Sequence, residues 1–204
     1  MQFVLASHNQ KKLEELSAIL GTLGIEVVPL PKDAPEPEEN GQTFEENARI
    51  KAMAAREFTG MPAIADDSGL SVDALSGEPG VRSARYCPGT DDDRNAFLLQ
   101  NMECVDECER QARFVCAICC VLEDGQEITV CGECEGEILT ELHGTGGFGY
   151  DPLFYVREYD CTFGELPAAV KNRISHRAQA LEKLAAVLRK KLKFGQETGE
   201  KKLC

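Results

Sequence analysis

The adjacent carboxylates Asp66 and Asp67 are the pair in this chain best suited to chemistry. They follow the apolar residues 63–65 and precede a Ser68-Gly69 turn. Two neighbouring negative charges are costly unless a cation lies near them, and open α/β sheets carry out chemistry beyond the carboxyl ends of their strands. We therefore predict a strand-end site for a hard metal ion, Mg²⁺, which takes oxygen ligands and commonly binds alongside phosphate. The alternative is a solvated turn, in which Asp, Ser and Gly are all common.

Residues 7–12, Ser-His-Asn-Gln-Lys-Lys, form a candidate phosphate-binding segment. They separate a short apolar strand, residues 3–6, from leucines at helical spacing. A helix start that follows a strand presents free N–H groups and the positive end of the helix dipole to an anion. Two lysines in a first helical turn also favour an anion nearby. The alternative role of Ser7 or Asn9 is to cap the helix, and the sequence has no P-loop glycine pattern.

Lys51 is a second candidate phosphate ligand. A capping box at residues 43–46 starts a helix that extends to about Phe58. The helical wheel places Lys51 on the face with small apolar residues, where a lysine needs an anion. Its side chain could instead extend to solvent.

Two neighbouring segments have roles that the sequence leaves open. The Pro-rich acidic loop at residues 29–42 could bring Glu38 or Glu39 to the metal, or it could be a solvated linker. Arg82 and Arg85, which follow the Ser-Gly-Glu-Pro-Gly turn at residues 76–80, could serve the substrate or a contact between subunits.

The glycine-rich segment at residues 144–154 predicts a loop that approaches a ligand closely. It holds four glycines around two aromatic residues, and glycine allows close approach of the backbone. Phe148 or Tyr150 offers a ring on which a base can stack, an interaction worth ~1–3 kcal/mol per base. The alternative is a mobile turn with core aromatics.

A basic segment at residues 171–177 precedes the last helix. Ser175 can cap this helix, which places His176 and Arg177 in its first turn. Cations there need an anionic or carbonyl partner, because the helix N-terminus is itself positive. The alternative is a basic surface turn.

The elements that must position these residues indicate a mixed α/β sheet with a second lobe. Residues 112–122 predict a strand, the Asp-Gly turn at 123–126 predicts a hairpin, and residues 127–134 form the partner strand. Residues 90–102 predict a helix with an acidic first turn. The antiparallel hairpin makes the sheet mixed.

Composition bounds the class of protein. The chain has 204 residues, of which 43% are hydrophobic and 28% charged, so we assign residues 1–194 to a single domain of two lobes and residues 195–204 to a loose tail. A net charge of −13 argues against a nucleic-acid partner, whose binding requires phosphate neutralisation. No apolar run is long enough for a membrane span, and the N-terminus lacks a signal-peptide pattern. We therefore expect a cytoplasmic protein.

Ten cysteines raise the question of a metal or disulfide site. Cys116-x-x-Cys119 and Cys131-x-x-Cys134 have the spacing of zinc ligands. However, residues 114–122 read as one continuous strand, on which residues three apart point to opposite faces. We therefore predict free, buried thiols in a reducing compartment.

In chain order, these motifs resemble those of the inosine/xanthosine triphosphate pyrophosphatases, a family that removes non-standard purine nucleotides. The matching segments are Ser-His-Asn-Gln-Lys-Lys at 7–12, Thr-Phe-Glu-Glu-Asn-Ala at 43–48 with Lys51, Ala-Asp-Asp-Ser-Gly-Leu at 65–70, Pro-Gly-Val-Arg-Ser-Ala-Arg-Tyr at 79–86, Gly-Gly-Phe-Gly-Tyr-Asp-Pro at 146–152 and Ser-His-Arg at 175–177. Each motif is weak by itself, whereas six in order are highly specific.

The resemblance implies an elongated α/β fold, with a long mixed sheet and two lobes flanking a central cleft, and usually a homodimer. It also implies Mg²⁺-dependent hydrolysis of ITP, dITP or XTP to the monophosphate and pyrophosphate, with residues 1–194 as one catalytic domain. Glu39 and Asp67 would hold the metal, and Asp67 would also be the general base. The implied substrate-binding residues are Ser7, His8, Asn9, Gln10, Lys11, Lys12, Lys51, Ser68, Phe148, Gly149, Tyr150, Asp151, Lys171, His176 and Arg177.

Two features depart from the family pattern. Ser7-His8 replaces a more familiar Thr-Gly pair, and His8 adds bulk where glycine would allow a phosphate to approach closely. Glu38 and Glu39 are adjacent, so the alignment of this loop could shift by one residue.

Three rival functions are left open by the sequence. The first is a Mg²⁺-dependent phosphatase, or a nucleotide pyrophosphatase with looser base choice. The second is a nucleotide-binding sensor without turnover, against which the Asp66-Asp67 pair argues because binding alone needs no base. The third is a cysteine-based redox or zinc module.

Overall fold

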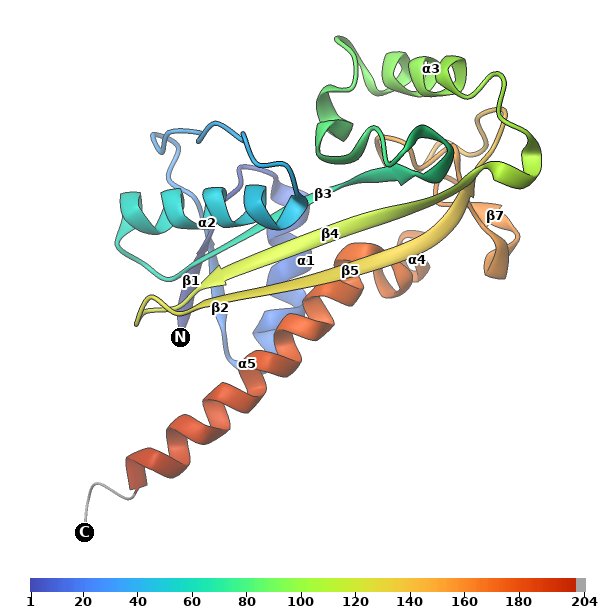
Figure 1. Ribbon diagram of the computed structural model, residues 1–204. Helices are drawn as coiled ribbons and strands as arrows, with labels where there is room; N and C mark the ends of the chain where they lie inside the picture. Colours follow the sequence, from blue (N-terminus) through green and yellow to red (C-terminus); the bar gives the residue numbers. More distant parts are fainter. Residues whose placement is uncertain (201–204) are drawn as a thin grey trace.

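The computed structural model describes the backbone of residues 1–200 and the side chains of residues 1–191 (Figure 1). The strands are β1 (Gln2–Leu5), β2 (Glu26–Pro29), β3 (Ala63–Val72), β4 (Gln111–Val121), β5 (Glu127–Ile138), β6 (Phe154–Val156) and β7 (Cys161–Thr162). The α-helices are α1 (Gln10–Leu20), α2 (Phe44–Thr59), α3 (Asp91–Asn101), α4 (Ala168–Ile174) and α5 (His176–Glu200). Short 3₁₀ helices are η1 (Gly21–Leu23), η2 (Asp73–Leu75), η3 (Gly80–Arg85), η4 (Glu107–Glu109) and η5 (Arg157–Tyr159).

The strands form one mixed sheet of seven in the order β2-β1-β3-β4-β5-β6-β7. β1 runs parallel to both of its neighbours, and every pairing from β3 to β7 is antiparallel. The long strands β3, β4 and β5 connect an end that carries β1, β2, α1 and α2 with an end that carries α3, β6 and β7 (Figure 1). The predicted mixed sheet with two lobes is confirmed.

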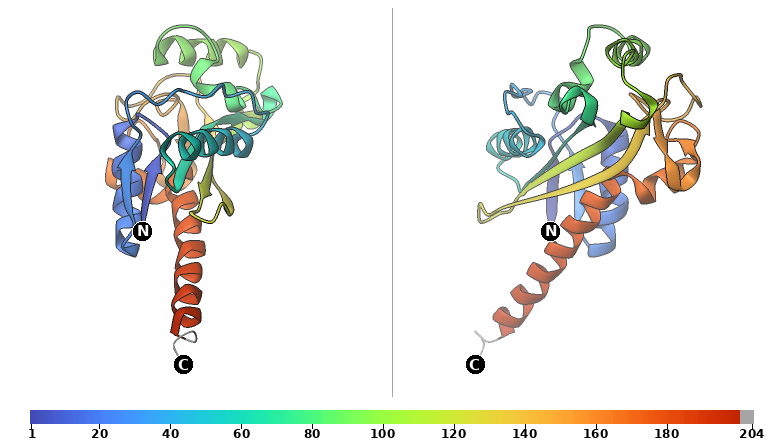
Figure 2. Two further views of the ribbon diagram at one scale, coloured as in Figure 1. Left: turned by 90° about the vertical axis from the view of Figure 1, so that its left-hand side faces the viewer. Right: turned by 45° about the vertical axis from the view of Figure 1, so that its right-hand side comes forward.

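Helices cover both faces of the sheet in the first lobe (Figure 2). α1 and α5 pack on one face, where Leu16 and Leu184 join Ile64 in a buried cluster. α2 packs on the other face, where Ala48 meets Ala65. Full burial of an aliphatic side chain stabilises the fold by about 1.5–3 kcal/mol. Side chains alternate between the two faces along a strand. Successive side chains of β3 therefore face α1 and α5 on one side and α2 on the other.

The second lobe has a core of its own. Leu98 of α3 and Met102, which follows the helix, pack with Phe114, Phe154 and Phe163. The ring centroids of Phe114 and Phe154 lie 4.6 Å apart, within the range of favourable aromatic pairs. This cluster fixes the end of β4 against β6 and so supports the glycine-rich loop that precedes β6.

The helix starts follow the predicted capping chemistry, with one difference. Asn9 Oδ1 accepts hydrogen bonds from two N–H groups in the first turn of α1, and Thr43 Oγ1 accepts one from the N–H of Glu46. The Glu46 carboxylate accepts from the N–H of Gln42 and not from that of Thr43. The predicted bounds of α2 and α3 agree with the structure to within a residue or two.

The strand-end prediction for Asp66 and Asp67 is wrong, because both residues lie inside β3. The Asp-Asp-Ser-Gly sequence reads as a turn, yet the backbone continues extended as far as Val72 and pairs with β4 throughout. β1, by contrast, pairs with β3 only up to Ile64. The acidic pair therefore lies just beyond the carboxyl end of β1, where that edge of β3 is no longer covered by a strand.

The cysteine-rich segment is the continuous strand that was predicted. Cys116, Cys119 and Cys120 are fully buried in β4, and burial raises the pKa of the Cys116 thiol to about 12. The nine cysteines among the described residues are free thiols. No group of three or more His, Cys, Asp or Glu side chains in the described part of the chain could hold a metal.

Two further predictions concern the C-terminal tail and membrane-spanning segments. Residues 195–200, expected in a loose tail, continue the backbone of α5, and residues 201–204 lie outside the described part. None of the described helices is long and apolar enough to cross a bilayer.

Candidate active site

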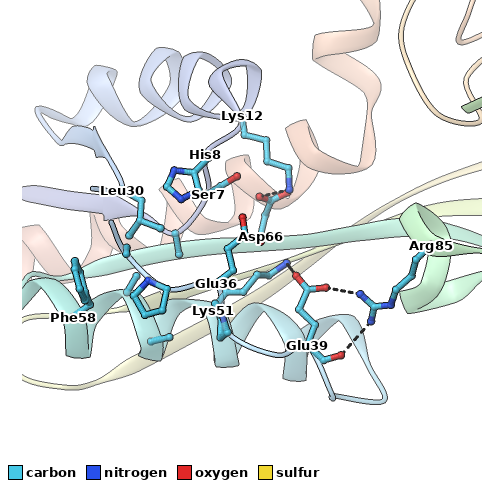
Figure 3. A pocket seen from close by; sticks show the side chains of 16 residues that line it. Ser7, His8, Lys12, Leu30, Glu36, Glu39, Lys51, Phe58, Asp66 and Arg85 are labelled. Carbon is cyan, nitrogen blue, oxygen red and sulfur yellow. Dashed lines mark hydrogen bonds and ion pairs between the residues drawn. The ribbon is translucent and has the colours of Figure 1, made fainter. Parts of the chain in front are cut away.

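The carboxylates of Asp66 and Asp67 point to opposite faces of the sheet. Asp66 faces α1 and α5. Lys12 Nζ lies 2.9 Å from Asp66 Oδ1 (Figure 3), and Arg177 Nε lies 3.3 Å from Asp66 Oδ2. Ser68 Oγ also donates to Asp66 Oδ2 at 3.2 Å. Burial alone would raise the pKa of Asp66, but the two cations outweigh it and hold that pKa far below its usual value. Asp66 is therefore ionised at neutral pH.

Asp67 faces α2 and has a different environment. Lys51 Nζ donates to Asp67 Oδ1 at 2.6 Å, and Asn47 Nδ2 donates to Asp67 Oδ2 at 3.4 Å. Burial raises the pKa of Asp67, with a smaller contribution from the negative charge of Glu39, and Lys51 opposes both only in part. A carboxylate with a raised pKa is the better proton acceptor of the two.

Glu39 completes the acidic cluster from the loop between β2 and α2. Lys51 Nζ lies 3.0 Å from Glu39 Oε1, so a single ammonium group bridges Glu39 and Asp67. Arg85 donates to both the carboxylate and the backbone carbonyl of Glu39, at 3.1 Å each (Figure 3). Glu38 is exposed. The structure thus brings Glu39, and not Glu38, to Lys51 and Asp67.

Residues 7–12 are only in part turned toward the cleft. Ser7, His8 and Lys12 line a cavity of about 400 Å³ together with Glu39 and Lys51. The three remaining residues lie elsewhere: Asn9 caps α1 and lines a second cavity, Gln10 donates to Glu14 of its own helix, and Lys11 is exposed with its ammonium 5.8 Å from the centroid of the Phe148 ring.

The remaining predicted substrate-binding residues gather around a second cavity of about 310 Å³. Lys12 lines both cavities, so the two adjoin at its side chain. The predicted residues that line the second cavity are Ser68, Phe148, Gly149, Tyr150, Asp151, Lys171, His176 and Arg177.

The two aromatic residues of the glycine-rich loop have different roles. Phe148 is 49% exposed, and the ammonium of Lys171 lies 4.9 Å from the centroid of its ring. Tyr150 is buried, and its hydroxyl donates to the carbonyl of Ser83 at 2.9 Å. Asp151 shapes the loop by accepting from the N–H of Phe148 and from Lys171. Phe148 is therefore the ring available for stacking.

His176 and Arg177, at the start of α5, are both buried. Burial, and to a smaller extent the charges of Arg177 and Lys171, hold the pKa of His176 well below its usual value, so its imidazole is neutral. The ring stacks on Phe114 with centroids 4.9 Å apart, and its Nδ1 has no hydrogen-bond partner among the described residues. Arg177 pairs with Glu15 at 3.1 Å as well as with Asp66. These are the anionic partners that cations in a first helical turn require.

Two residues of the site, Glu15 and Asn47, were missed from the sequence, and the role of a third, Arg85, was left open. Glu15 of α1 holds Arg177, Asn47 of α2 contacts Asp67, and Arg85 of η3 binds Glu39. Asn47 lies four residues before Lys51 and so on the same face of α2, which was a usable signal. The partners of Glu15 and Arg85 are distant in sequence, and no local pattern indicates them.

The site combines an open α/β sheet, carboxylates paired with lysines and an adjoining cavity lined by aromatic rings, and its chemistry suits a phosphorylated ring compound such as a nucleotide. The chain belongs to the Ham1 family, whose model matches residues 3–187.

Relatives of known name agree with this assignment. The chain is 50% identical over 191 residues to a dITP/XTP pyrophosphatase of Symbiobacterium thermophilum, covering 92% of this chain and 96% of that one. It is 50% identical over 184 residues to a protein of the same name from Pseudomonas aeruginosa, covering 88% and 93%. A solved HAM1 protein from Coxiella burnetii is 45% identical, with a TM-score of 0.88 and coverage of 93% and 99%. A dITP/XTP pyrophosphatase from Mycobacterium abscessus is 43% identical, with a TM-score of 0.76 and coverage of 90% and 97%.

Proposed function

We propose that this chain hydrolyses the triphosphates of non-standard purine nucleosides, dITP, ITP and XTP, to the monophosphate and pyrophosphate. The observation that carries the proposal is the junction of two cavities at Lys12. One cavity holds charges suited to phosphates, and the other offers the Phe148 ring and buried polar groups suited to a base. The names of relatives that match almost the whole chain support this substrate class.

Mg²⁺ is the metal that we propose, with Glu39 and Asp67 as its protein ligands. Mg²⁺ prefers oxygen ligands and is commonly bound by one or two carboxylates together with substrate phosphates. The donor set fits, because both carboxylates converge on a single cation, the ammonium of Lys51, at 3.0 and 2.6 Å. When bound, the ion would lower the pKa of a coordinated water and offset phosphate charge.

The protein residues have separate tasks in the proposed reaction. Asp67 accepts the proton of the water that attacks the α-phosphorus, a type of catalysis worth ~10²–10⁴-fold in rate. Lys12 and Lys51 offset the charge that develops on the leaving pyrophosphate. Asp66 is a poor base because of its lowered pKa, and it fixes Lys12 and Arg177 through ion pairs.

Base choice would depend on donors at the start of α5. Arg177 and an N–H of the neutral His176 can donate to a 6-oxo group, whereas the 6-amino group of adenine would meet them donor to donor. An unpaired buried polar group costs about 1–3 kcal/mol, so two such contacts correspond to ~10²–10⁴-fold discrimination.

A panel of nucleoside triphosphates, assayed with and without Mg²⁺ for pyrophosphate and orthophosphate, tests the proposal. Pyrophosphate released from dITP, ITP and XTP, with far less from ATP and none after chelation by EDTA, is the expected result. Orthophosphate as the first product would indicate a phosphatase, and binding without turnover would indicate a sensor.

We also propose a homodimer, as the resemblance implies. Light scattering coupled to size-exclusion chromatography should give twice the mass of 22.4 kDa. A monomeric mass at micromolar concentration would contradict this part of the proposal.

A further inference from the structure

Glu39 lies in a loop without regular secondary structure, and Asp67 lies in β3. The two carboxylates nevertheless meet at the ammonium group of Lys51. Between β2 and α2, the chain forms neither helix nor strand from Leu30 to Thr43. We infer that Arg85 and Asn47 are positioning residues, which hold this loop so that Glu39 and Asp67 converge on one cation. This inference rests on the metal-dependent function proposed above.

Arg85 holds Glu39 by two separate groups of one guanidinium. Its Nη1 lies 3.1 Å from Glu39 Oε2, and its Nη2 donates to the Glu39 carbonyl at 3.1 Å. The other carboxylate oxygen, Oε1, lies 3.0 Å from Lys51 (Figure 3). A planar guanidinium with several donors can fix both the backbone and the side chain of a residue, whereas an ammonium acts as a point charge. Arg85 therefore restricts both the position and the rotation of the Glu39 carboxylate.

Asn47 connects the same loop to the general base from the other side. It is fully buried in the first turns of α2. Its Oδ1 accepts from the N–H of Gly41 at 2.9 Å, and its Nδ2 donates to Asp67 Oδ2 at 3.4 Å. A Cβ on Gly41 would lie 2.7 Å from Asn47 Oδ1, so the contact needs glycine two residues after Glu39. One amide thus ties the loop to Asp67.

The helix that carries Arg85 is itself fixed on the strand that carries Asp67. Ser83 Oγ of η3 accepts from the N–H of Leu70 at 2.8 Å and donates to the Gly80 carbonyl at 2.6 Å. A Cβ on Gly69 would lie 2.4 Å from Ser83 Oγ, so η3 can approach β3 this closely only because residue 69 is glycine. The backbone that carries Arg85 is therefore anchored on the strand that carries Asp67.

Arg82 provides a matched control within the same 3₁₀ helix. Its guanidinium pairs with Glu78 at 2.9 Å, and its side chain is 61% exposed. Neither Arg82 nor Glu78 belongs to the acidic cluster of Glu39 and Asp67. The side chain of Arg85 is 51% exposed, so substitutions at both arginines should leave the folded core intact.

The test is direct binding of Mn²⁺, used as a probe for Mg²⁺ and followed by electron paramagnetic resonance, to the substrate-free proteins. Loss of residues that orient metal ligands typically weakens metal affinity by ~10–100-fold. We expect a weakening of this order in both Arg85→Gln and Arg85→Lys, and wild-type affinity in Arg82→Gln. The Mg²⁺ concentration for half-maximal pyrophosphate release should rise in parallel in the two Arg85 variants, while the KM for dITP at saturating Mg²⁺ changes little.

The direction in which Mn²⁺ affinity changes distinguishes a positioning role of Arg85 from an effect of its charge alone. Arg85→Gln removes a positive charge beside Glu39. If charge alone mattered, the loss of its Coulomb repulsion would strengthen cation binding in this variant. Unchanged or tighter Mn²⁺ binding in Arg85→Gln, or wild-type binding in Arg85→Lys, would overturn the positioning role of Arg85. Asn47→Ala should weaken Mn²⁺ binding in the same way, and if this buried variant unfolds, the Arg85 variants still decide the proposal.

The proposed function and the positioning role fail in different ways. A wild-type protein that binds no Mn²⁺ and releases no pyrophosphate overturns both. A wild-type protein that does both, with Arg85 variants that match it, overturns only the positioning role.

Discussion

Asp66 and Asp67 are neighbours in sequence, yet each carboxylate binds the ammonium of a different lysine on a different face of the sheet. Lys12 lies 2.9 Å from Asp66, and Lys51 lies 2.6 Å from Asp67. The pKa of Asp66 is lowered and that of Asp67 is raised. Two carboxylates whose environments move their pKa values apart are suited to different roles. Here the first fixes cations in place, and the second can accept a proton.

Asp67→Asn should abolish pyrophosphate release while leaving nucleotide binding largely intact. The amide keeps the size of the side chain but cannot accept a proton, so a loss of at least ~10²–10⁴-fold in kcat is expected. The measurement is kcat for dITP beside the Kd of a non-hydrolysable analogue. Turnover close to that of the wild type would contradict the assignment of the general base.

Asp66→Asn serves as the contrasting variant. It leaves the charges of Lys12 and Arg177 without their buried partner, which typically costs about 3–5 kcal/mol. We therefore expect a larger fall in the free energy of unfolding in this variant than in Asp67→Asn, as measured by urea denaturation.

Most of the residues that line the two cavities could be predicted from the sequence, whereas their distribution over the two faces of the sheet could not. Helix starts, the inward Lys51 and the glycine-rich loop each have a local pattern that indicates a role. The Asp-Asp-Ser-Gly segment has the composition of a turn, and that pattern led to the strand-end error. Its extended conformation depends on pairing with β4 and on ion pairs with residues more than 50 positions away, such as Lys12.

Contacts between distant segments explain the rest of what the sequence did not indicate. The local sequence around Glu15 indicates no role in the site, and that around Arg85 leaves its role open. Their functions follow from the tertiary fold, which brings Arg177 to Glu15 and the β2–α2 loop to Arg85. By contrast, the α/β class, the hairpin and the helix caps depend on local patterns, and these were predicted correctly.

His176 should make stability depend on pH on the acidic side of neutrality. Its pKa is held well below 6.5 in the folded protein, whereas an unfolded imidazole titrates near 6.5. Between these two values the unfolded chain binds a proton that the folded chain does not, so stability falls as the pH decreases through this window. One such group contributes a slope of at most ~1.4 kcal/mol per pH unit.

The measurement for His176 is the free energy of unfolding in urea at a series of pH values. His176→Gln should show a shallower slope below pH ~6.5 than the wild type. Asp66 and Asp67 are present in both proteins, so the comparison isolates the contribution of His176. Equal slopes in the wild type and His176→Gln would contradict a buried neutral imidazole.

Arg177→Ala should relax the preference for ITP over ATP. Arg177 is fixed by Asp66 and Glu15 at the edge of the second cavity, and the loss of one oriented donor corresponds to about 1–3 kcal/mol, or roughly 5–150-fold, in the ratio of kcat/KM values. Arg173→Ala, in which an exposed arginine of α4 is removed, is the control and should leave the ratio unchanged. An unchanged ratio in Arg177→Ala would exclude a base-reading role.

Gly132→Ala should disturb the site through the contact between β5 and the start of α5. A Cβ at residue 132 of β5 would lie 2.2 Å from the carbonyl oxygen of His176 and 2.4 Å from the backbone nitrogen of Ala180. Because these are backbone atoms, the start of α5 must shift, and overpacking of this kind costs about 1–3 kcal/mol. For a chain of this size, each kcal/mol lowers Tm by roughly 2–4 °C. The shift should also raise the KM for dITP, since it displaces His176 and Arg177.

Gly21→Ala is the matched control for Gly132→Ala. A Cβ at residue 21 would meet nothing within 4 Å, and the backbone there is already helical, with φ of −57°. This variant should keep the wild-type Tm, or raise it slightly because alanine restricts the unfolded chain. Thermal denaturation of the two variants in parallel separates a close approach of α5 to β5 from a general intolerance of alanine. If Gly132→Ala had the Tm and KM of Gly21→Ala, the start of α5 could not depend on contact with residue 132.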